Sequence, residues 1–471
     1  MARQSRRNLP NLDSVSSINP DGSRRFIRPA HVSGRFTRAR TIVGLLLLLI
    51  TVILPWIDIG GYPAVLLDIP HRRFHLFGIT LIAQDLWLSF FILSGLGFLL
   101  FVVTSLWGRI WCGWTCPHSL LLEQIFRPIE RLVEGDSARQ RALDDAPWTS
   151  SKVMRRGLKH ALFIIVSLSL AHVFLSYFVP VEVIGKWILS NPSEHWDSFL
   201  LVATLTGLFY FNFSWFREQL CIVICPYGRV QSALIDDDSL IIGYDTTRGE
   251  PRGKPSDPAN GHCIDCLRCV NVCPMGIDIR MGLQIECIGC AYCIDACDQV
   301  MDKLRRPRGL IRYDSLNGFA GKRRKLLRPR TLLYAGFLLV GSIVMTLSLF
   351  QLKPFHLSVT RMSGPPFHRT ETAVRNQFSV RLLNKTGQET ALTIRADSGA
   401  IAQMSLNDPV PLKPYEETVL PLIVSVPATE FRAPFEFHLT LSRPDGTIVS
   451  SRDLRFLGPD LQASQRELVF D

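Results

Sequence analysis

The sequence predicts a polytopic α-helical membrane protein with five spans, an inserted cysteine-rich α+β module and a C-terminal all-β domain of the immunoglobulin type. Three observations support this fold class: five long apolar stretches, two closely spaced blocks of cysteines, and a final region in which apolar and polar residues alternate. The 471 residues are 47% hydrophobic and have a positive mean hydropathy. This composition is too apolar for an ordinary soluble protein of this length.

Five apolar stretches approach the roughly 20 residues that a membrane-spanning helix needs. They cover residues 41–57, 86–106, 161–179, 198–215 and 331–350. Basic clusters adjoin their ends at three places, and the positive-inside rule keeps such clusters in the cytoplasm; they are residues 35–40, 155–159 and 322–330. The basic residues at 71–73 are the one contrary cluster. An odd number of spans then places the N-terminus in the cytoplasm and the β domain outside.

These stretches divide the chain into five predicted parts. They are a basic cytoplasmic tail (1–40) that includes Arg6, Arg7, Arg24 and Arg25, a four-span domain (41–240), the cysteine-rich module (241–330), a fifth span (331–351) and the β domain (358–471). The net charge of +11 does not indicate a nucleic-acid partner, because the basic residues gather beside the apolar stretches. Membrane lipid is the expected contact instead.

The last part of the chain alternates apolar and polar residues in short runs. Such runs predict β-strands, and they cover residues 378–383, 391–396, 419–426 and 435–441. Pro444 and Gly446 between the last strands predict a hairpin turn, because proline presets φ and glycine supplies positive φ. About 110 residues of this pattern suit an immunoglobulin-like sandwich. We expect it to serve docking or stability, since it has no cysteine.

Eight of the twelve cysteines form two blocks with the C-x2-C-x2-C-x3-C spacing of bacterial two-cluster ferredoxins. In such runs the fourth cysteine of each block ligates the other cluster. The predicted ligands of one 4Fe–4S cluster are Cys263, Cys266, Cys269 and Cys297, and those of the other are Cys287, Cys290, Cys293 and Cys273. A pair of zinc sites is the alternative, but zinc does not require this three-plus-one repeat. The spacing therefore predicts a ferredoxin-like α+β module.

The other four cysteines form two C-x3-C-P pairs. Each pair directly follows an apolar stretch: Cys112 and Cys116 follow the second, and Cys221 and Cys225 follow the fourth. A residue before proline is pushed out of the α region, so we expect a helix break at Cys116 and Cys225. Lone cysteines in apolar helices are ordinarily inert, but two matched pairs favour a redox or metal role. Four soft thiolates suit Cu(I), zinc or another iron centre.

Three histidines are weaker candidates. His172 lies within an apolar stretch, and His118 and His262 lie near cysteine blocks. For each, a hydrogen-bonded structural histidine is the favoured interpretation over a metal ligand.

The order of these motifs resembles the FixG/CcoG/RdxA family of cytochrome c oxidase accessory proteins. The resemblance covers nearly the whole chain from Thr41 and rests on residues 111–117, 221–226 and 263–297. It implies a protein of the bacterial inner membrane, with a periplasmic β domain, that helps to assemble a cbb-type haem–copper oxidase. It also implies oxidase assembly factors or subunits as partners and reduction of Cu(II) to Cu(I). The expected cytoplasmic placement of the cysteine-rich module, not the resemblance, suggests a cytoplasmic electron donor. The resemblance thereby assigns the catalytic and copper-binding roles to Cys112, Cys116, Cys221 and Cys225.

Two other functions compete with copper reduction. One is a quinol dehydrogenase-like electron conduit to a periplasmic reductase, whose mark would be a quinone pocket. The other is a non-redox assembly scaffold in which the clusters are structural. The sequence leaves open the electron donor, the side from which copper arrives, the metal at the C-x3-C-P cysteines and whether the protein is a homo-oligomer.

Overall fold

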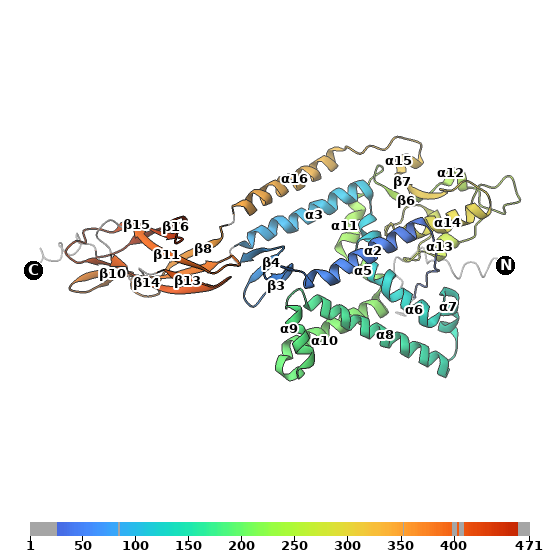
Figure 1. The fold of residues 1–471 in the computed structure, drawn as a ribbon. Coiled ribbons are helices and arrows are strands. Elements are labelled where there is room, and N and C mark those ends of the chain that lie inside the picture. The colour runs from blue at the N-terminus through green and yellow to red at the C-terminus, as the bar shows by residue number, and fades with distance from the viewer. Residues whose placement is uncertain (1–25, 83–84, 352, 398–402, 405–408, 460–471) are drawn as a thin grey trace, which may run out of the picture. The chain divides into compact units, whose positions relative to one another are not determined.

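The computed structural model describes residues 26–82, 85–351, 353–397, 403–404 and 409–459. Of the predicted tail arginines, Arg6, Arg7, Arg24 and Arg25 lie outside these ranges. The chain forms two compact units, of which the first comprises Met1–Phe77 and Leu81–Met345 and the second Gly78–Thr80 and Thr346–Asp471. The first unit holds the cysteines and most of the helical part, and the second holds the β domain (Figure 1).

Five helices of the described chain are long and apolar enough to cross a membrane, which confirms the predicted number. They are α2 (Arg35–Ile53), α3 (Trp87–Trp107), α8 (Ser150–Leu175), α10 (Trp196–Phe211) and α16 (Pro329–Phe350). The start of α8 was placed too late, at residue 161. The side chain of Thr149 accepts a hydrogen bond from the backbone N–H of Lys152, so the helix begins in the basic segment before the apolar stretch.

Short elements connect these helices. Five short strands separate α2 from α3: β1 (Asp58–Ile59), β2 (Tyr62–Pro63), β3 (Val65–Asp68), β4 (Arg73–Leu76) and β5 (Ile79–Ile82). Between α3 and α8 lie α4 (Ile110–Trp114), α5 (Pro117–Leu121), a π-helical turn (Leu122–Phe126), α6 (Arg127–Glu134) and α7 (Ser137–Asp145). Helix α9 (Val181–Leu189) precedes α10, and two π-helical turns (Asn212–Phe216, Leu220–Ile224) lead from α10 to α11 (Pro226–Leu234). Each C-x3-C-P pair thus lies between an apolar helix and a short helix.

The ferredoxin-like module has a small antiparallel sheet and short helices. Its elements are β6 (Ile241–Tyr244), α12 (Thr246–Gly249), α13 (Arg268–Asn271), α14 (Tyr292–Lys303), β7 (Ile311–Asp314) and α15 (Leu316–Phe319). Ile242, Ile294 and Met301 are buried in its core together with several of the cysteines. Cys112 and Cys221 pack against the same core. Phe36 of α2 packs there as well, so the module core extends to the start of the first apolar helix and to both C-x3-C-P segments.

The second unit holds an immunoglobulin-like sandwich. One sheet has β12 (Gln403–Met404), β14 (Glu417–Pro427), β10 (Ala373–Asn384) and β8 (Phe355–Arg361), with β9 (His368–Arg369) also on β10; the other has β13 (Val410–Leu412), β11 (Thr390–Asp397), β15 (Phe435–Ser442) and β16 (Ile448–Phe456). Phe378 and Phe437 meet between the sheets at a centroid distance of 5.9 Å. The four predicted strands are confirmed, and so is the hairpin, whose Gly446 has φ 83°.

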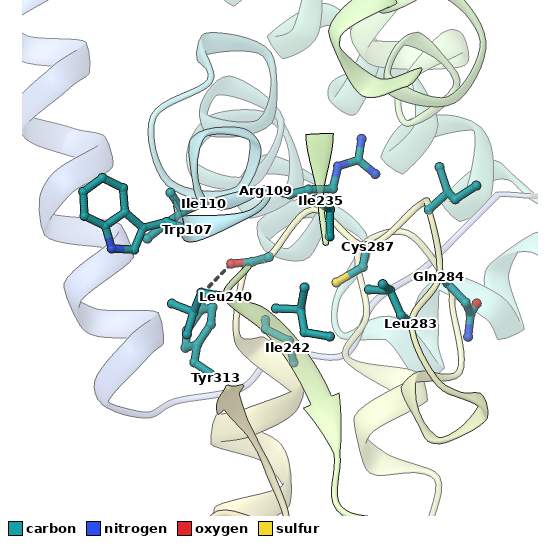
Figure 2. Close-up of a pocket in the computed structure, with 13 residues that line it drawn as sticks. Trp107, Arg109, Ile110, Ile235, Leu240, Ile242, Leu283, Gln284, Cys287 and Tyr313 are labelled. Carbon is teal, nitrogen blue, oxygen red and sulfur yellow. Dashed lines mark hydrogen bonds between the residues drawn. The ribbon is translucent and has the colours of Figure 1, made fainter. Parts of the chain in front are cut away.

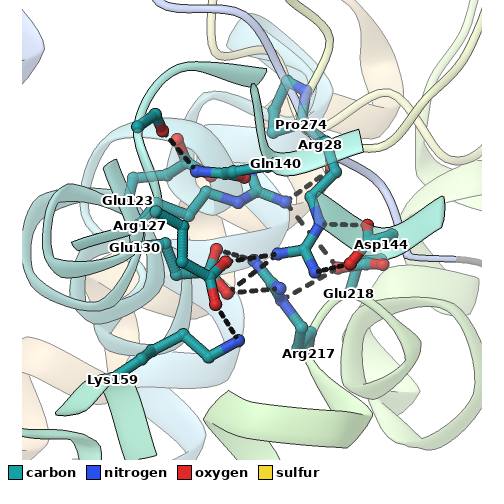
Figure 3. A network of polar contacts seen from close by, with 12 residues as sticks. Arg28, Glu123, Arg127, Glu130, Gln140, Asp144, Lys159, Arg217, Glu218 and Pro274 are labelled. Atoms are coloured by element: carbon teal, nitrogen blue, oxygen red, sulfur yellow. Dashed lines mark hydrogen bonds and ion pairs between the residues drawn. The ribbon is translucent and has the colours of Figure 1, made fainter. Parts of the chain in front are cut away.

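A buried ionic network joins the N-terminal segment to the helices around the first C-x3-C-P pair (Figure 3). Arg217 binds both carboxylate oxygens of Glu130, at 3.1 and 3.0 Å, and Arg28 binds the same carboxylate at 3.1 Å. Arg127 donates to the carbonyl of Pro274 in the ferredoxin-like module at 3.1 Å. Part of the predicted basic cytoplasmic tail is thus packed into the fold, because Arg28 lies among buried carboxylates and α2 begins at Arg35.

Candidate electron-transfer site

The two ferredoxin blocks have left-handed backbone residues at matching positions. The residue before the second cysteine is left-handed in both, with φ 54° at Asp265 and φ 69° at Gly289. The residue after the second cysteine is left-handed too, with φ 59° at Leu267 and φ 64° at Ala291. Non-glycine residues adopt this region at a cost of about 1–2 kcal/mol. Its recurrence at matching positions shows that the chain is wound tightly around each cysteine group.

Each predicted set of cluster ligands surrounds a cavity of its own. One cavity, with about 370 Å³ of space between atoms, is lined by Cys263, Cys266, Cys269 and Cys297. The other, with about 340 Å³, is lined by Cys273, Cys287, Cys290 and Cys293, and also by Cys269. The fourth cysteine of each block therefore lines the cavity of the other block, and its ligation of that cluster stays a prediction. Because Cys269 lines both cavities, the two are direct neighbours.

Arg40 supplies an independent test of whether a cluster fits the second cavity. This side chain is fully buried, and its Nη1 and Nη2 atoms have no hydrogen-bond partner among the described residues. Its Nε donates to the carbonyl of Gly113, and its guanidinium lies 4.7 Å from the ring centre of Tyr292. A buried cation left without compensation is strongly destabilising. Glu123 is the nearest carboxylate charge, and a cluster held by four thiolates is anionic, so a cluster beside Cys290 would add a counter-charge to the side of Arg40 that has no hydrogen-bond partner.

Helix α14 of the module also caps the first apolar helix. The Asp295 carboxylate accepts hydrogen bonds from the backbone N–H of Phe36 at 3.3 Å and from that of Thr37 at 2.7 Å. A carboxylate at this position satisfies free N–H groups and complements the helix dipole. A Cβ atom at Gly34 would clash with this carboxylate. Asp295 lies between two predicted cluster ligands, so this cap fixes α2 to the second cluster site.

The C-x3-C-P cysteines lie at helix breaks, as predicted. Cys116 and Cys225 are extended, with ψ 121° and 110°, and each precedes the proline that starts the next helix. The four thiols are close enough to influence one another. Burial raises the pKa of Cys112 to about 11 against the opposing charge of Arg109. Burial and the nearby Cys116 raise the pKa of Cys221 to about 12. Metal binding here would therefore displace protons.

These four cysteines do not form a closed single-ion site. In the part of the chain that the structure describes, no three His, Cys, Asp or Glu side chains converge closely enough to hold one metal ion. A 4Fe–4S cluster holds its ligands farther apart than one ion does, so this finding leaves the two cluster cavities unaffected. The Cys112 thiol instead lies 3.5 Å from Oε1 of Gln231. Copper ligation by Cys112, Cys116, Cys221 and Cys225 stays a prediction.

The first C-x3-C-P helix touches the second cluster block directly. A Cβ atom on Gly113 would lie 2.6 Å from the carbonyl oxygen of Ile288 and 2.9 Å from the backbone nitrogen of Cys290, so only glycine permits this contact. Trp114 donates to the hydroxyl of Tyr313 at 3.1 Å. Cys112 is thus next in sequence to a residue in backbone contact with a predicted cluster ligand.

Comparison with known proteins places this arrangement in a family. Residues 216–316 match the family described as "4Fe-4S dicluster domain", residues 88–134 match "4Fe-4S binding domain", and residues 345–459 match "IG-like fold at C-terminal of FixG". Protein RdxA of Cereibacter sphaeroides is 37% identical over 392 residues, which cover 79% of this chain and 82% of RdxA. The chain belongs to the FixG/RdxA family.

Two further relatives agree with this assignment. Protein RdxB of Cereibacter sphaeroides is 35% identical over 461 residues, which cover 93% of this chain and 94% of RdxB. The nitrogen fixation protein FixG of Rhizobium meliloti is 33% identical over 429 residues and 81% of each chain. This FixG/RdxA-family member is therefore a membrane protein with a ferredoxin-type iron–sulfur electron-transfer module.

Sequence reasoning missed two arginines of this FixG/RdxA-family protein. Arg40 looked like part of a basic tail, and Arg109 had no motif around it. Arg109 donates to Gln231 at 2.5 Å and to the carbonyl of Gly228 at 3.2 Å, which hold it close to Cys112 and Cys287. Its position directly after the end of an apolar helix was the one available signal.

The three candidate histidines have structural partners. His118 bonds the carbonyl of Arg217 at 3.0 Å and the amide nitrogen of Asn212 at 3.1 Å, and burial lowers its pKa to about 4. His172 bonds the carbonyl of Leu168 in its own helix at 2.8 Å, and His262 lies 3.4 Å from Nη2 of Arg248. With both ring nitrogens occupied, His118 is not free to ligate a metal.

Proposed function

We propose that this FixG/RdxA-family protein passes electrons from its ferredoxin-like module to a soft-metal substrate at the four C-x3-C-P cysteines, and that the substrate is Cu(II). The observation that supports this most is the backbone contact between Gly113 and the segment from Ile288 to Cys290. Bound 4Fe–4S clusters would supply one-electron transfer. One electron converts each Cu(II) to Cu(I).

The cysteines suit this substrate chemically. Soft thiolates stabilise Cu(I) over Cu(II), so a thiolate site favours the reduced ion. Because the four thiols share a neighbourhood without forming a closed site, copper would have to draw them together as it binds. An open site that closes on its substrate also permits release of the product. Gln231, in contact with the Cys112 thiol, would orient it.

The cellular setting of the proposal follows from charge and family. The basic clusters beside the apolar helices support a cytoplasmic N-terminus and a cytoplasmic ferredoxin-like module. A cytoplasmic donor would then reduce the module, and the Cu(I) product would serve assembly of a cbb-type oxidase together with its assembly factors or subunits. The β domain would be the periplasmic part that docks these partners.

The test is anaerobic and uses the purified full-length protein. The protein is reduced with dithionite, freed of excess reductant and mixed with Cu(II), and Cu(I) is followed with a chromogenic chelator. Serine at all four positions Cys112, Cys116, Cys221 and Cys225 should abolish fast Cu(I) formation while the EPR signals of the clusters remain. Equal Cu(I) yields from wild type and this variant would refute the copper site.

An additional iron centre at the same cysteines is the second candidate. The match of residues 88–134 to a 4Fe-4S binding domain favours it, because this region contains Cys112 and Cys116. Two clusters correspond to about eight irons per chain. Iron and sulfide analysis of anaerobically purified protein separates the candidates: about eight irons in both wild type and the four-serine variant supports copper, and a loss of iron in the variant supports the additional centre.

A further inference from the structure

A separate cavity, with about 820 Å³ of space between atoms, lies between the end of helix α3 and the ferredoxin-like module (Figure 2). Trp107, the last residue of α3, forms one side. Ile242 of β6 and the segment that contains Leu283 and Ile285 form the others. All of these residues belong to the first compact unit. The cavity therefore lies within a single compact unit.

This cavity shares a wall with the second cluster cavity. Cys287 and Ile242 line both of them. A molecule bound here would therefore contact two residues that also line the cavity of the predicted second cluster. Figure 2 shows the Cys287 sulfur among the side chains around the cavity. The position is the one that a membrane-soluble electron carrier would need.

The wall and the rim of the cavity are mainly apolar. Trp107 is 45% exposed, Leu283 46% and Ile285 60%, and all three line the cavity. Trp107 ends an apolar helix, where tryptophan marks the boundary between membrane and water. The cavity is thus open to an apolar ligand that arrives from the lipid. The guanidinium of Arg109 is tied to Gln231 and Gly228, so the wall lacks the basic cluster that a nucleotide or an acidic protein donor would require.

Two aromatic side chains and one hydroxyl give the cavity the features of a ring site. Trp107 and Tyr313 both line its wall (Figure 2). The Tyr313 hydroxyl donates to the carbonyl of Gly289 at 2.5 Å and accepts from Trp114 at 3.1 Å, which fixes its ring. A mostly apolar wall with a few fixed polar groups is typical of cofactor pockets. An acyl chain would need neither the rigid aromatic side nor the contact with Cys287.

We propose that this cavity binds the ring of a membrane quinone or quinol. The inference goes beyond the proposed function and does not depend on copper, because the cavity shares no residue with the four C-x3-C-P cysteines. The residues that would contact the ring are Trp107, Tyr313 and the segment from Leu283 to Cys287. The ring would lie against Cys287, on the side that faces the end of α3.

The test measures binding directly in the full-length protein in lipid nanodiscs. An azido-substituted ubiquinone analogue is photolysed with the protein, and labelled peptides are mapped by mass spectrometry. Labelling should saturate, should fall on peptides that contain Trp107 or residues 283–287, and should be competed by decylubiquinone. Labelling that does not saturate, or that falls mainly elsewhere, would overturn the proposal.

A matched pair of variants sharpens this test. Ile285→Trp fills the rim and should weaken labelling at least tenfold. Met281→Trp introduces the same side chain four residues earlier in the chain. Met281 is 56% exposed but does not line the cavity, so this variant should be labelled to the same extent as wild type. EPR of the clusters checks that both variants fold. Equal labelling in the two variants, or competition by a phospholipid as effective as that by decylubiquinone, would show that the cavity is not a quinone site.

The same labelling on the variant with serine at all four C-x3-C-P positions separates this inference from the copper proposal. Saturable labelling is expected there, whatever the outcome of the copper assay. Its loss in that variant alone would contradict the independence of the two sites.

Discussion

Arg40 of helix α2 is a buried cation that lies close to Cys290 of the second cluster cavity. Arg40→Gln should lower the reduction potential of the cluster at that site, because a nearby positive charge stabilises the more negative reduced state. The check is an EPR-monitored redox titration, with the exposed Arg38→Gln as the matched control. An unchanged potential in Arg40→Gln, or the same shift in both variants, would refute this role.

Glu130 couples the buried network to pH. Burial alone would raise its pKa, but Arg217, Arg28 and Lys159 outweigh burial and lower it from 4.5 to about 2. The folded protein therefore binds fewer protons than the unfolded chain between these values. The contribution to stability is complete above pH 4.5 and is lost as the pH falls towards about 2.

Glu130→Gln should lower stability at neutral pH by about 3–5 kcal/mol, because the buried Arg217 and Arg28 lose the charged carboxylate they share and Arg217 keeps only the more distant Glu218, at 3.8 Å. It should also flatten the loss of stability below pH 4.5. Thermal unfolding in detergent across pH checks both effects, with the exposed Glu194→Gln as control. A wild-type acid profile in Glu130→Gln would show that another group controls acid unfolding.

At the scale of elements, the cap of α2 by Asp295 joins the first apolar helix to the module. Asp295→Ala should cost about 1 kcal/mol and should increase proteolysis of residues 26–34. Asp302→Ala, on the same helix, removes an exposed ion pair with Arg308 and should cost far less. Thermal unfolding and limited proteolysis compare the two. Equal losses would mean that the cap adds nothing beyond a surface charge.

The elements were predictable where one local pattern decides them. Apolar length gave the five helices, and alternation with a Pro-Asp-Gly turn gave the hairpin. The start of α8 was not predictable from apolar length, because the cap at Thr149 and the basic first turns determine it. The packing of the segment before α2 was not predictable, because Glu130, a partner of Arg28, lies 102 residues away in the sequence and local composition does not reveal it.

For the whole molecule, the cysteine sets could be proposed from the sequence because ligand spacing is local, and ligation of the clusters by these sets stays a prediction. The left-handed residues at matching positions and the two cavities agree with that spacing. The contact of Gly113 with Cys290, the burial of Arg40 and the cavity beside Cys287 arise from long-range packing. No single segment of the sequence determines these contacts. The sequence could therefore indicate candidate site residues, but not the packing that brings the C-x3-C-P segment against the ferredoxin-like module.

The orientation of the chain in the membrane is also a prediction about the whole molecule. Basic clusters beside the apolar helices favour a cytoplasmic N-terminus and a β domain outside the membrane. A reporter fused after Asp471 that works only outside the cytoplasm should be active, and the same reporter on the N-terminus should be inactive. Protection of the β domain from protease added to intact spheroplasts would reverse the topology.

The central claim is that the close contact at Gly113 connects the ferredoxin-like module to the C-x3-C-P cysteines. The most direct measurement is the rate of Cu(I) formation after dithionite-reduced protein meets Cu(II), compared between Gly113→Ala and Gly97→Ala. A Cβ at Gly113 must push α4 away from the Cys290 backbone, whereas one at Gly97 in α3 meets open space. We predict at least tenfold slower Cu(I) formation in Gly113→Ala, with cluster EPR and copper binding retained, and a wild-type rate in Gly97→Ala. A wild-type rate in Gly113→Ala would contradict the claim.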